Sequence, residues 1–279
     1  MVSPRNPLNI GAVARAMANF GFERLTVVAP YAPHWREARS AVGAPGLLKN
    51  AKESTTLAEA VAACTLVIGT GTLTHRKPEQ RVVPLPALAP QVVAEIRRGG
   101  RVALVFGPEK HGLTREDLSW CQLLVEIPTD PRQPSMNLGQ AVAVCLYELA
   151  SGAKAHGQSA GSTYGLKPVP FDESPGHELT PAPCAGRSTH RLKPGPFEEI
   201  PNREINAPAA PSGSLDRLAE VIEDVMTAAG YSPRSMQAAN RHDLRLLLRR
   251  LAPTERDTRR ILGLFRRILW RLHQNGKGK

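Results

Sequence analysis

The sequence predicts an α/β protein, with a parallel sheet covered by helices on both faces and a small all-α unit at the C-terminus. Residues 1–150 alternate short apolar strand patterns with helical patterns, and residues 213–279 are mostly helical in pattern. Residues 151–212 hold ten of the chain's 25 prolines and show no periodicity. Continuously apolar strands separated by helices are typical of a parallel sheet buried on both faces. We therefore expect a domain at 1–150, a flexible linker at 151–212 and a three-helix unit at 213–279.

The elements of the first domain follow from apolar periodicity. The stretch "NPLNIGAVARAM" (6–17) predicts a helix, because apolar residues recur at i, i+3, i+4 and i+7 from Ile10 onward. Asn9 takes the expected capping position, Gly11 lets another backbone come close, and Arg15 points off the apolar stripe. Strands are expected at 24–30, 65–71, 101–107 and 122–128, and further helices at 57–63, 84–98, from 114 onward and at 137–150.

The C-terminal unit is expected to hold three helices. The first follows a capping Ser214 and ends at Gly230, the second ends before Pro253, and the third opens with Thr254 and Asp257 as a capping pair. The whole chain carries a formal charge of +11, and residues 213–279 hold 14 Lys and Arg against seven Asp and Glu. This concentration of positive charge indicates a polyanionic partner such as nucleic acid, although a solvated helix face explains it equally well.

Four cysteines without a CxxC pair or a histidine cluster favour neither a metal site nor a disulfide framework. No apolar run approaches the length of a membrane span, and the start "MVSPRNP" lacks the apolar segment of a signal peptide. We therefore expect a soluble cytoplasmic protein without a membrane partner.

Three loops that are rich in Gly and Pro follow expected strands. They are "GTGTLTHRK" (69–77), "GPEKHG" (107–112) and "PTDPRQPSMNLG" (128–139). Ligands of open parallel sheets bind beyond the carboxyl ends of the strands, so these loops suit a small molecule held mainly by main-chain groups. None of them contains a phosphate loop, a complete dinucleotide fingerprint or a serine-nucleophile motif. Each loop taken alone is equally consistent with a simple turn.

Taken in order, three longer stretches carry a family resemblance. "NPLNIGAVARAMANFGF", "LVFGPEKHGLT" and "IPTDPRQPSMNLGQAVAVCLYEL" closely resemble the motifs of the SPOUT superfamily, and within it the TrmH-like RNA 2'-O-ribose methyltransferases. With its basic helical tail, the chain is most similar to the TrmJ type, which modifies tRNA in the anticodon loop. The resemblance covers residues 4–150 well and residues 213–272 in outline. It implies a homodimer that binds S-adenosylmethionine in a deep trefoil knot and needs no metal.

The resemblance also assigns roles to single residues. The matching catalytic positions are Asn9, Arg15, Glu109, Ser135 and Asn137. The implied cofactor-binding residues are Thr70, Gly71, Thr72, Phe106, Gly107, Glu109, Gly112, Ile127, Pro128, Ser135, Met136 and Asn137. The expected RNA-binding residues are Arg15, Arg76, Arg241, Arg245, Arg249 and Arg260.

The chemistry implied for Arg15 is electrostatic. A guanidinium is essentially never deprotonated in proteins, so we interpret Arg15 as a group that binds an RNA phosphate and stabilises a developing alkoxide, not as a plain base. Plainer interpretations stand beside these roles: Asn9 and Asn137 as helix caps, and Glu109 as the cap of a turn. Two other functions remain open, namely methylation of rRNA and RNA binding without catalysis.

The chain departs from the family at one point. The family has a strand before the stretch that matches "NPLNIG", whereas here that stretch follows Met1 almost directly. The loss of one strand of a parallel sheet would expose an edge and weaken the core.

Overall fold

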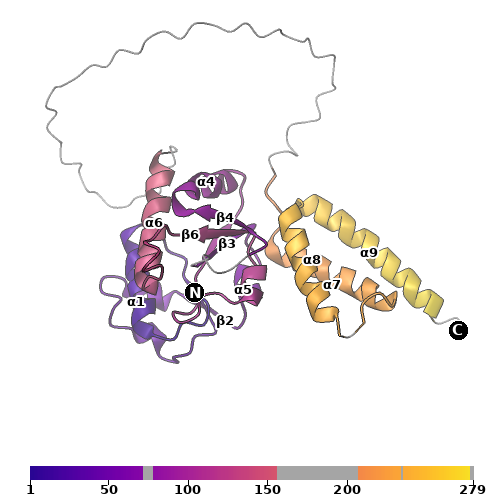
Figure 1. Ribbon diagram of the computed structural model, residues 1–279, viewed down its shortest axis with the longest axis horizontal. Helices are drawn as coiled ribbons and strands as arrows, with labels where there is room; N and C mark the ends of the chain where they lie inside the picture. Colours follow the sequence, from indigo (N-terminus) through magenta and orange to yellow (C-terminus); the bar gives the residue numbers. More distant parts are fainter. Residues whose placement is uncertain (72–77, 156–206, 234, 277–279) are drawn as a thin grey trace, which may run out of the picture. The chain divides into compact units, whose positions relative to one another are not determined.

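The computed structural model describes residues 1–71, 78–155, 207–233 and 235–276. Its elements follow one another along the chain as drawn in Figure 1. They are α1 (Pro7–Asn19), β1 (Thr26–Val28), η1 (Trp35–Glu37), α2 (Pro45–Lys49), β2 (Lys52–Ser54), α3 (Leu57–Val61), β3 (Leu66–Thr70), β4 (Arg81–Pro84), η2 (Leu85–Ala87), α4 (Ala89–Arg97), β5 (Val102–Val105), α5 (Arg115–Ser119), β6 (Leu123–Glu126), α6 (Leu138–Ala155), α7 (Ser212–Ala228), α8 (Gln237–Leu251) and α9 (Glu255–Gly276).

The strands form a four-stranded sheet in the order β4-β6-β3-β5 and a two-stranded sheet of β1 and β2. The pairings between these named strands are parallel, and β3 lies between β5 and β6, with Gly69 opposite Val105 and Leu124. This confirms the predicted parallel α/β sheet. Strands β2 and β4 were not predicted, because "KES" contains no apolar residue and "RVVP" carries only two.

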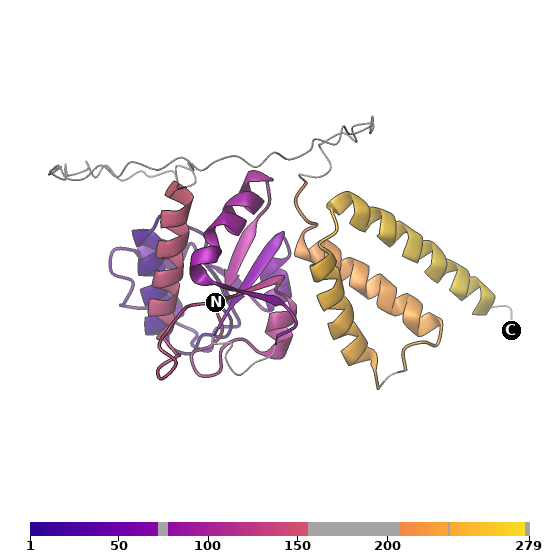
Figure 2. The ribbon, with the colours of Figure 1, turned by 45° about the horizontal axis from the view of Figure 1, so that its top comes forward.

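Helices cover both faces of the sheet, as predicted. On one face, Ile68 and Val125 belong to the buried cluster that includes residues of α1, α4 and α6. On the other face, Val67 and Leu124 pack with Leu118 of α5 and with α3. Successive strand residues point to opposite faces, which is why neighbours such as 67 and 68 enter different clusters. Figures 1 and 2 show α1 and α6 side by side on one flank of the sheet.

The first residues of the chain lie between the two sheets. Val2 forms a parallel bridge with Val28, and its N–H donates to the carbonyl of Phe106 at 2.8 Å. The backbone of Met1–Ser3 therefore contacts both β1 and the end of β5. Before α1, where the family resemblance leads us to expect a strand, the described residues thus form an isolated bridge and no named strand.

Helix α1 is capped by Asn6, not by Asn9 as the sequence predicted. The Asn6 side chain accepts from Leu8 N–H at 2.9 Å, and Pro7 follows at the first helical position, where a missing N–H costs nothing. Asn9 instead lies inside the first turn and is buried. The prediction for Gly11 is confirmed, because a Cβ there would lie 2.8 Å from the backbone N of Ala41.

The C-terminal helices α7, α8 and α9 form a layer in which α7 packs against both of the others. Thr254 caps α9 as predicted, since its Oγ1 accepts from Asp257 N–H at 3.2 Å. Helix α7 begins at Ser212, two residues before the predicted cap Ser214. Helix α6 runs on to Ala155, so the first residues of the predicted linker 151–212 are helical, and residues 156–206 lie outside the described part of the chain.

The described residues of 207–276 belong to the same compact unit as those of 1–155. Backbone bonds join them: Ser212 N–H donates to the carbonyl of Cys64 at 2.8 Å, and Gly213 N–H donates to that of Ala62 at 2.9 Å. Within the described residues, no helix is both long and apolar enough to cross a membrane.

Candidate active site

A cavity of about 290 Å³ lies at the carboxyl ends of β3, β5 and β6. Its wall combines the loops after these three strands with α5 and the start of α6. The lining residues are Thr70, Gly71, Phe106, Gly107, Pro108, Glu109, Lys110, His111, Gly112, Leu113, Leu118, Glu126, Ile127, Thr129, Pro134, Ser135, Met136, Leu138 and Ala141. The three loops singled out in the sequence therefore meet at one place, as the parallel topology requires.

The loop after β5 is folded tightly back on itself. Gly112 N–H donates to the carbonyl of Pro108 at 2.9 Å, and Gly112 has a φ of +64°, which favours glycine. Gly107 faces this turn so closely that a Cβ would lie 2.3 Å from Gly112 C and from Leu113 N. Both glycines are thus needed for the main-chain surface that the loop presents to the cavity.

A chain of side-chain hydrogen bonds joins three of the predicted catalytic residues. Asn137 Nδ2 donates to Asn9 Oδ1 at 3.1 Å, and Asn9 Nδ2 donates to Glu109 Oε1 at 2.8 Å. Asn137 also caps α6, since its Oδ1 accepts from Gly139 N–H at 2.9 Å. The chain ties the start of α1 and the start of α6 to the loop after β5, so all three motifs converge on one polar network.

Glu109 is held in its charged form. Partial burial acts to raise the pKa of its carboxyl, but hydrogen bonds from the Asn9 side chain and from backbone N–H groups, including those of Arg5 and Asn6, outweigh it and lower the pKa. The two backbone donors each lie 3.2 Å from the carboxylate. Glu109 therefore does more than cap its own turn, because it fixes the segment before α1.

The structure places most of the predicted cofactor-binding residues in the cavity wall. They are Thr70, Gly71, Phe106, Gly107, Glu109, Gly112, Ile127, Ser135 and Met136. Pro128 and Asn137 are not among the lining residues. Thr72 and Arg76 lie outside the described residues.

Arg15 is exposed on α1 and does not line the cavity of its own chain. Its neighbours along the apolar stripe, Val13 and Ala14, are buried, which confirms that Arg15 points off the stripe. Helix α1 thus places Asn9 in the polar network with Glu109 and Asn137, and it places Arg15 on the exposed surface.

Two of the predicted RNA-binding arginines are buried, which corrects that prediction. Arg249 is 2% exposed, and its guanidinium donates to Asp216 Oδ1 at 2.9 Å and to Ser212 Oγ at 2.9 Å. Arg245 is 8% exposed; its guanidinium donates to Ser119 Oγ at 2.8 Å. Both guanidinium groups are satisfied inside the protein and are not available to bind phosphate.

These two arginines share one aromatic ring. The guanidinium carbons of Arg245 and Arg249 lie 4.0 and 4.9 Å from the ring centroid of Trp120. Arg245 also pairs with the Glu116 carboxylate. Helix α8 is thus fastened to α5 and the residue after it by cation–π contacts and charge-assisted hydrogen bonds.

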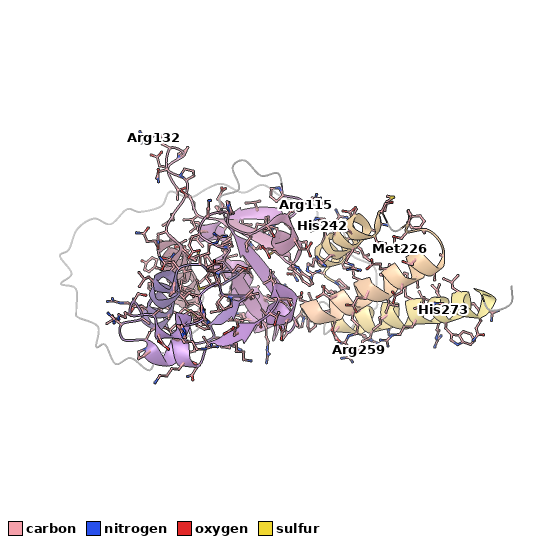
Figure 3. All side chains as sticks on the ribbon, turned by 90° about the horizontal axis from the view of Figure 1, so that it is seen from below. Arg115, Arg132, Met226, His242, Arg259 and His273 are labelled. Carbon is pink, nitrogen blue, oxygen red and sulfur yellow. The ribbon has the colours of Figure 1, made fainter. Side chains whose placement is uncertain are left out.

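The other two predicted RNA-binding arginines of the tail differ from each other. Arg241 is engaged by Glu223, whose two carboxylate oxygens accept from its Nε at 2.8 Å and its Nη2 at 3.0 Å. These bonds raise the pKa of Arg241. Arg260 is exposed on α9. The exposed arginines of the tail therefore lie chiefly on α9. Figure 3 labels two residues of this helix, Arg259 and His273.

Sequence reasoning missed several residues of the cavity. The sequence assigns Leu113 and Leu118 to no site, and it places Leu138 and Ala141 only within the predicted helix 137–150. A sequence signal was present for the last two, since they continue the helix that begins directly after the Ser135 loop. Thr129 belongs to the same loop and donates through Oγ1 to the carbonyl of Pro134 at 3.2 Å.

Comparison with known proteins gives this arrangement a family. The model of the SpoU rRNA Methylase family matches residues 1–147, which include all the motifs of the cavity. A "tRNA (cytidine/uridine/adenosine-2'-O-)-methyltransferase TrmJ" of Pseudomonas aeruginosa is 41% identical over 155 residues, 53% of this chain and 58% of that protein. A "tRNA (cytidine-2'-O-)-methyltransferase TrmJ" of Methanocaldococcus jannaschii is 39% identical over 53% of this chain and 65% of its own length. The matches thus span less than two thirds of these two relatives.

Other similarities extend over nearly the whole chain. A "tRNA (cytidine/uridine-2'-O-)-methyltransferase TrmJ" of Citrobacter koseri is 30% identical over 277 residues, 97% of this chain and 93% of that one. The crystal structure of TrmJ from Z. mobilis ZM4 aligns with a TM-score of 0.69 at 25% identity and covers 96% of both chains. Because the family model covers more than half of the chain and its matched residues build the cavity, the chain belongs to the SpoU rRNA methylase family.

Proposed function

We propose that this protein is an S-adenosylmethionine-dependent methyltransferase that acts on a ribose 2'-hydroxyl of tRNA, in the anticodon loop. The observation that carries the proposal is the hydrogen-bonded series Asn137–Asn9–Glu109 beside the cavity formed by the three motif loops. The names of the Citrobacter koseri and Pseudomonas aeruginosa relatives support a tRNA substrate and 2'-O chemistry. The anticodon loop follows from the resemblance to the TrmJ type.

The cavity wall fits the proposed cofactor. Apolar side chains of Phe106, Ile127 and Leu138 suit an adenine ring, and the folded loop between Gly107 and Gly112 offers main-chain groups for the nucleoside. The wall carries two carboxylates, Glu109 and Glu126, beside one lysine, Lys110, so a positively charged group finds carboxylates of opposite charge there. When bound, S-adenosylmethionine supplies an electrophilic methyl group on a positively charged sulfonium. The parallel strand order and the convergence of three loops also support the knot that the resemblance implies.

The chain's own groups have three tasks in this reaction. The donor and the ribose oxygen must be held in line, which rigid loop geometry favours. Water must be kept out, which the walls formed by Leu113 and Met136 assist. The charge that develops on the ribose oxygen must be stabilised, and we assign this to Arg15, which also binds the neighbouring phosphate. That phosphate is our candidate for the proton acceptor, because a guanidinium remains protonated.

We further propose that the protein acts as a homodimer, in which Arg15 reaches the site of the partner. Arg15 is exposed and does not line its own chain's cavity. Large apolar side chains nearby on α1 and α6 are exposed as well: Leu8 to 56%, Val144 to 38% and Tyr147 to 58%. A second copy that packed on this face would bury them and bring its own Arg15 close to the first cavity.

A mixed-dimer experiment tests the placement of Arg15. Arg15→Ala should bind S-adenosylmethionine normally but transfer no methyl group, and Met136→Arg should block the cavity. If Arg15 acts across the interface, mixing the two inactive proteins restores transfer, because one of the mixed sites combines an intact cavity with an intact Arg15. If mixing restores nothing although heterodimers form, Arg15 does not act in trans.

The substrate is tested by methyl transfer from labelled S-adenosylmethionine to a mixture of tRNA and rRNA, followed by mapping of the modified ribose. Methylation of one anticodon-loop ribose of tRNA is expected. Methylation of rRNA, which the name of the matched family model favours, would support the proposed methyl transfer but show that rRNA, not tRNA, is the substrate. RNA binding without cofactor binding and without transfer would instead support a silent RNA-binding protein.

A further inference from the structure

The outward face of α9 combines exposed arginines with an exposed aromatic side chain. The inward face of the helix is apolar: Ile261 and Leu262 are half-buried against the cluster of α7 and α8, whereas Leu264 and Ile268 at the border of that face are exposed (57% and 38%). The opposite face carries exposed arginines and one large exposed aromatic, Trp270, whose exposure is 60%. Residues 258–276 contain no acidic residue but five arginines, namely Arg259, Arg260, Arg266, Arg267 and Arg271.

Helical spacing brings these groups together. Residues three and four apart are neighbours on a helix, so Trp270 lies next to Arg266 and Arg267. Gly263 follows one turn further back, and Arg259 and Arg260 lie one turn beyond it. The result is a surface strip that runs from paired arginines over a bare stretch of backbone to a second pair of arginines and then to an indole ring.

Gly263 is a second, independent observation. Glycine is among the least favourable residues in a helix interior, and a Cβ at Gly263 would meet nothing within 4 Å. No packing inside the described chain therefore explains it. A glycine on an exposed helix face allows another backbone to approach closely, and here the flanking arginines give that approach a positive charge.

We propose that this strip is a binding site for a single-stranded segment of RNA. The sugar–phosphate backbone crosses α9 at Gly263, the arginines on either side bind phosphates, and one unpaired base stacks on Trp270. Gly263 and Trp270 are seven residues apart on the helix, about 10 Å along its axis, so phosphate and base contacts fall on adjacent nucleotides or nearly so. Arginine-lined tracks with aromatic platforms are how proteins hold single strands.

The charges on the strip agree with this ligand. Arg259 is the one described arginine of the strip with a defined acidic partner, since its Nε donates to Glu255 Oε1 at 3.1 Å in an exposed pair, which contributes little. An acidic protein surface would also match the arginines, but it would not need the exposed indole beside a bare glycine. The proposal rests on the proposed function in taking RNA as the substrate.

The test measures RNA affinity of the full-length protein by titration with bulk tRNA, with an unstructured RNA oligonucleotide and with the same sequence in a duplex. Trp270→Ala should weaken binding of tRNA and of the single strand about tenfold, and leave duplex binding unchanged. Trp270→Phe should recover part of the loss, because phenylalanine still stacks. The matched control is Tyr231→Ala, since Tyr231 is an exposed aromatic (74%) of the same unit that lies off the strip.

Salt dependence separates the two kinds of contact. Arg266→Gln and Arg267→Gln should each lower the salt slope of binding by about 0.7, the value for one phosphate of a single strand, whereas Trp270→Ala should leave the slope unchanged. Gly263→Gln should raise thermal stability slightly, since glutamine is the better helix former, and yet weaken RNA binding. If Gly263 served only the fold, Gly263→Gln would instead lower thermal stability and leave RNA binding unchanged.

Equal affinities of Trp270→Ala and Tyr231→Ala for tRNA would overturn the proposal, as would a Trp270→Ala protein that changes its oligomeric state while keeping its RNA affinity. Methyl transfer is measured in parallel. If the wild-type protein methylates RNA and Trp270→Ala binds it equally well, only this inference fails. If no RNA is methylated but Trp270→Ala still loses single-strand affinity, the proposed function fails and the site stands.

Discussion

Asn9 and Glu109 are joined by a hydrogen bond of 2.8 Å between Nδ2 and Oε1, although one hundred residues separate them in the chain. Asn9 is buried in the first turn of α1, and Glu109 lies on the loop that forms part of the cavity wall. The bond therefore fixes the position of the loop after β5 relative to the helix that carries Arg15. It also stabilises the charged form of Glu109 and so gives the site a defined response to pH.

Loss of this bond should shift the acid limit of cofactor binding. In the wild-type protein, hydrogen bonds keep the pKa of Glu109 below its ordinary value of 4.5, despite the opposing effect of burial. The contribution of the Glu109 carboxylate to cofactor binding is therefore fully present above pH 4.5. It is lost only as the pH falls through the lowered pKa of Glu109. Asn9→Ala removes one donor, so the loss should begin at a higher pH. Binding of S-adenosylmethionine followed by calorimetry from pH 4 to pH 7 checks this; identical acid limbs for both proteins would contradict it.

Gly107→Ala should distort the loop after β5, which we propose binds the cofactor, without unfolding the protein. A Cβ at position 107 would lie 2.3 Å from Gly112 C and Leu113 N, both of which are backbone atoms, so the loop must move. We expect cofactor affinity to fall more than tenfold while the far-UV circular dichroism stays unchanged. Gly46→Ala is the matched control, because a Cβ there meets nothing within 4 Å. Unaltered cofactor affinity in Gly107→Ala would show that the loop does not shape the binding site.

Arg249→Ala should lower the free energy of unfolding by about 3 kcal/mol, because it leaves the half-buried Asp216 carboxylate without its buried partner and removes a cation from the Trp120 ring. Arg250→Ala, next in sequence but exposed, should change it by no more than about 0.5 kcal/mol. Urea unfolding of both variants provides the comparison. Equal stabilities together with weaker RNA binding by Arg249→Ala would restore the sequence-based assignment of Arg249 to RNA.

Tyr147→Glu should dissociate the proposed homodimer. Tyr147 is 58% exposed on α6 and makes an edge contact with Phe20 at a centroid distance of 5.9 Å, so a charge would be buried if a second copy packed here. Analytical ultracentrifugation of the wild type and the variant measures the dissociation constant, which should rise at least about a hundredfold. Tyr231→Glu, in the C-terminal helices, should have no effect. A wild-type protein that is monomeric at every concentration would refute the dimer itself.

Much of the site followed from local sequence. Gly107 and Gly112 lie in a stretch whose Gly and Pro content predicts a loop, and the strand patterns around Ile68 and Leu124 predict that three loops meet at one edge of a parallel sheet. The motif residues Asn9, Glu109 and Asn137 could be selected because the three ordered motifs that contain them resemble those of a known family. Their hydrogen bonds to one another could not be predicted, because they depend on how α1, α6 and a loop pack.

The C-terminal helices mark the limit of sequence reasoning. The arginines of α8 and α9 look alike in sequence, since both sets recur at helical spacing with a strong positive charge. Only the tertiary structure separates Arg249, which is buried against Trp120 and Asp216, from Arg260, which is exposed on α9. The sequence by itself determined the parallel α/β fold, the three loops and the basic tail, because these depend on periodicity, turn chemistry and composition. Which arginines face solvent was decided by the packing of α8 on α5, since burial depends on neighbours that are distant in the chain.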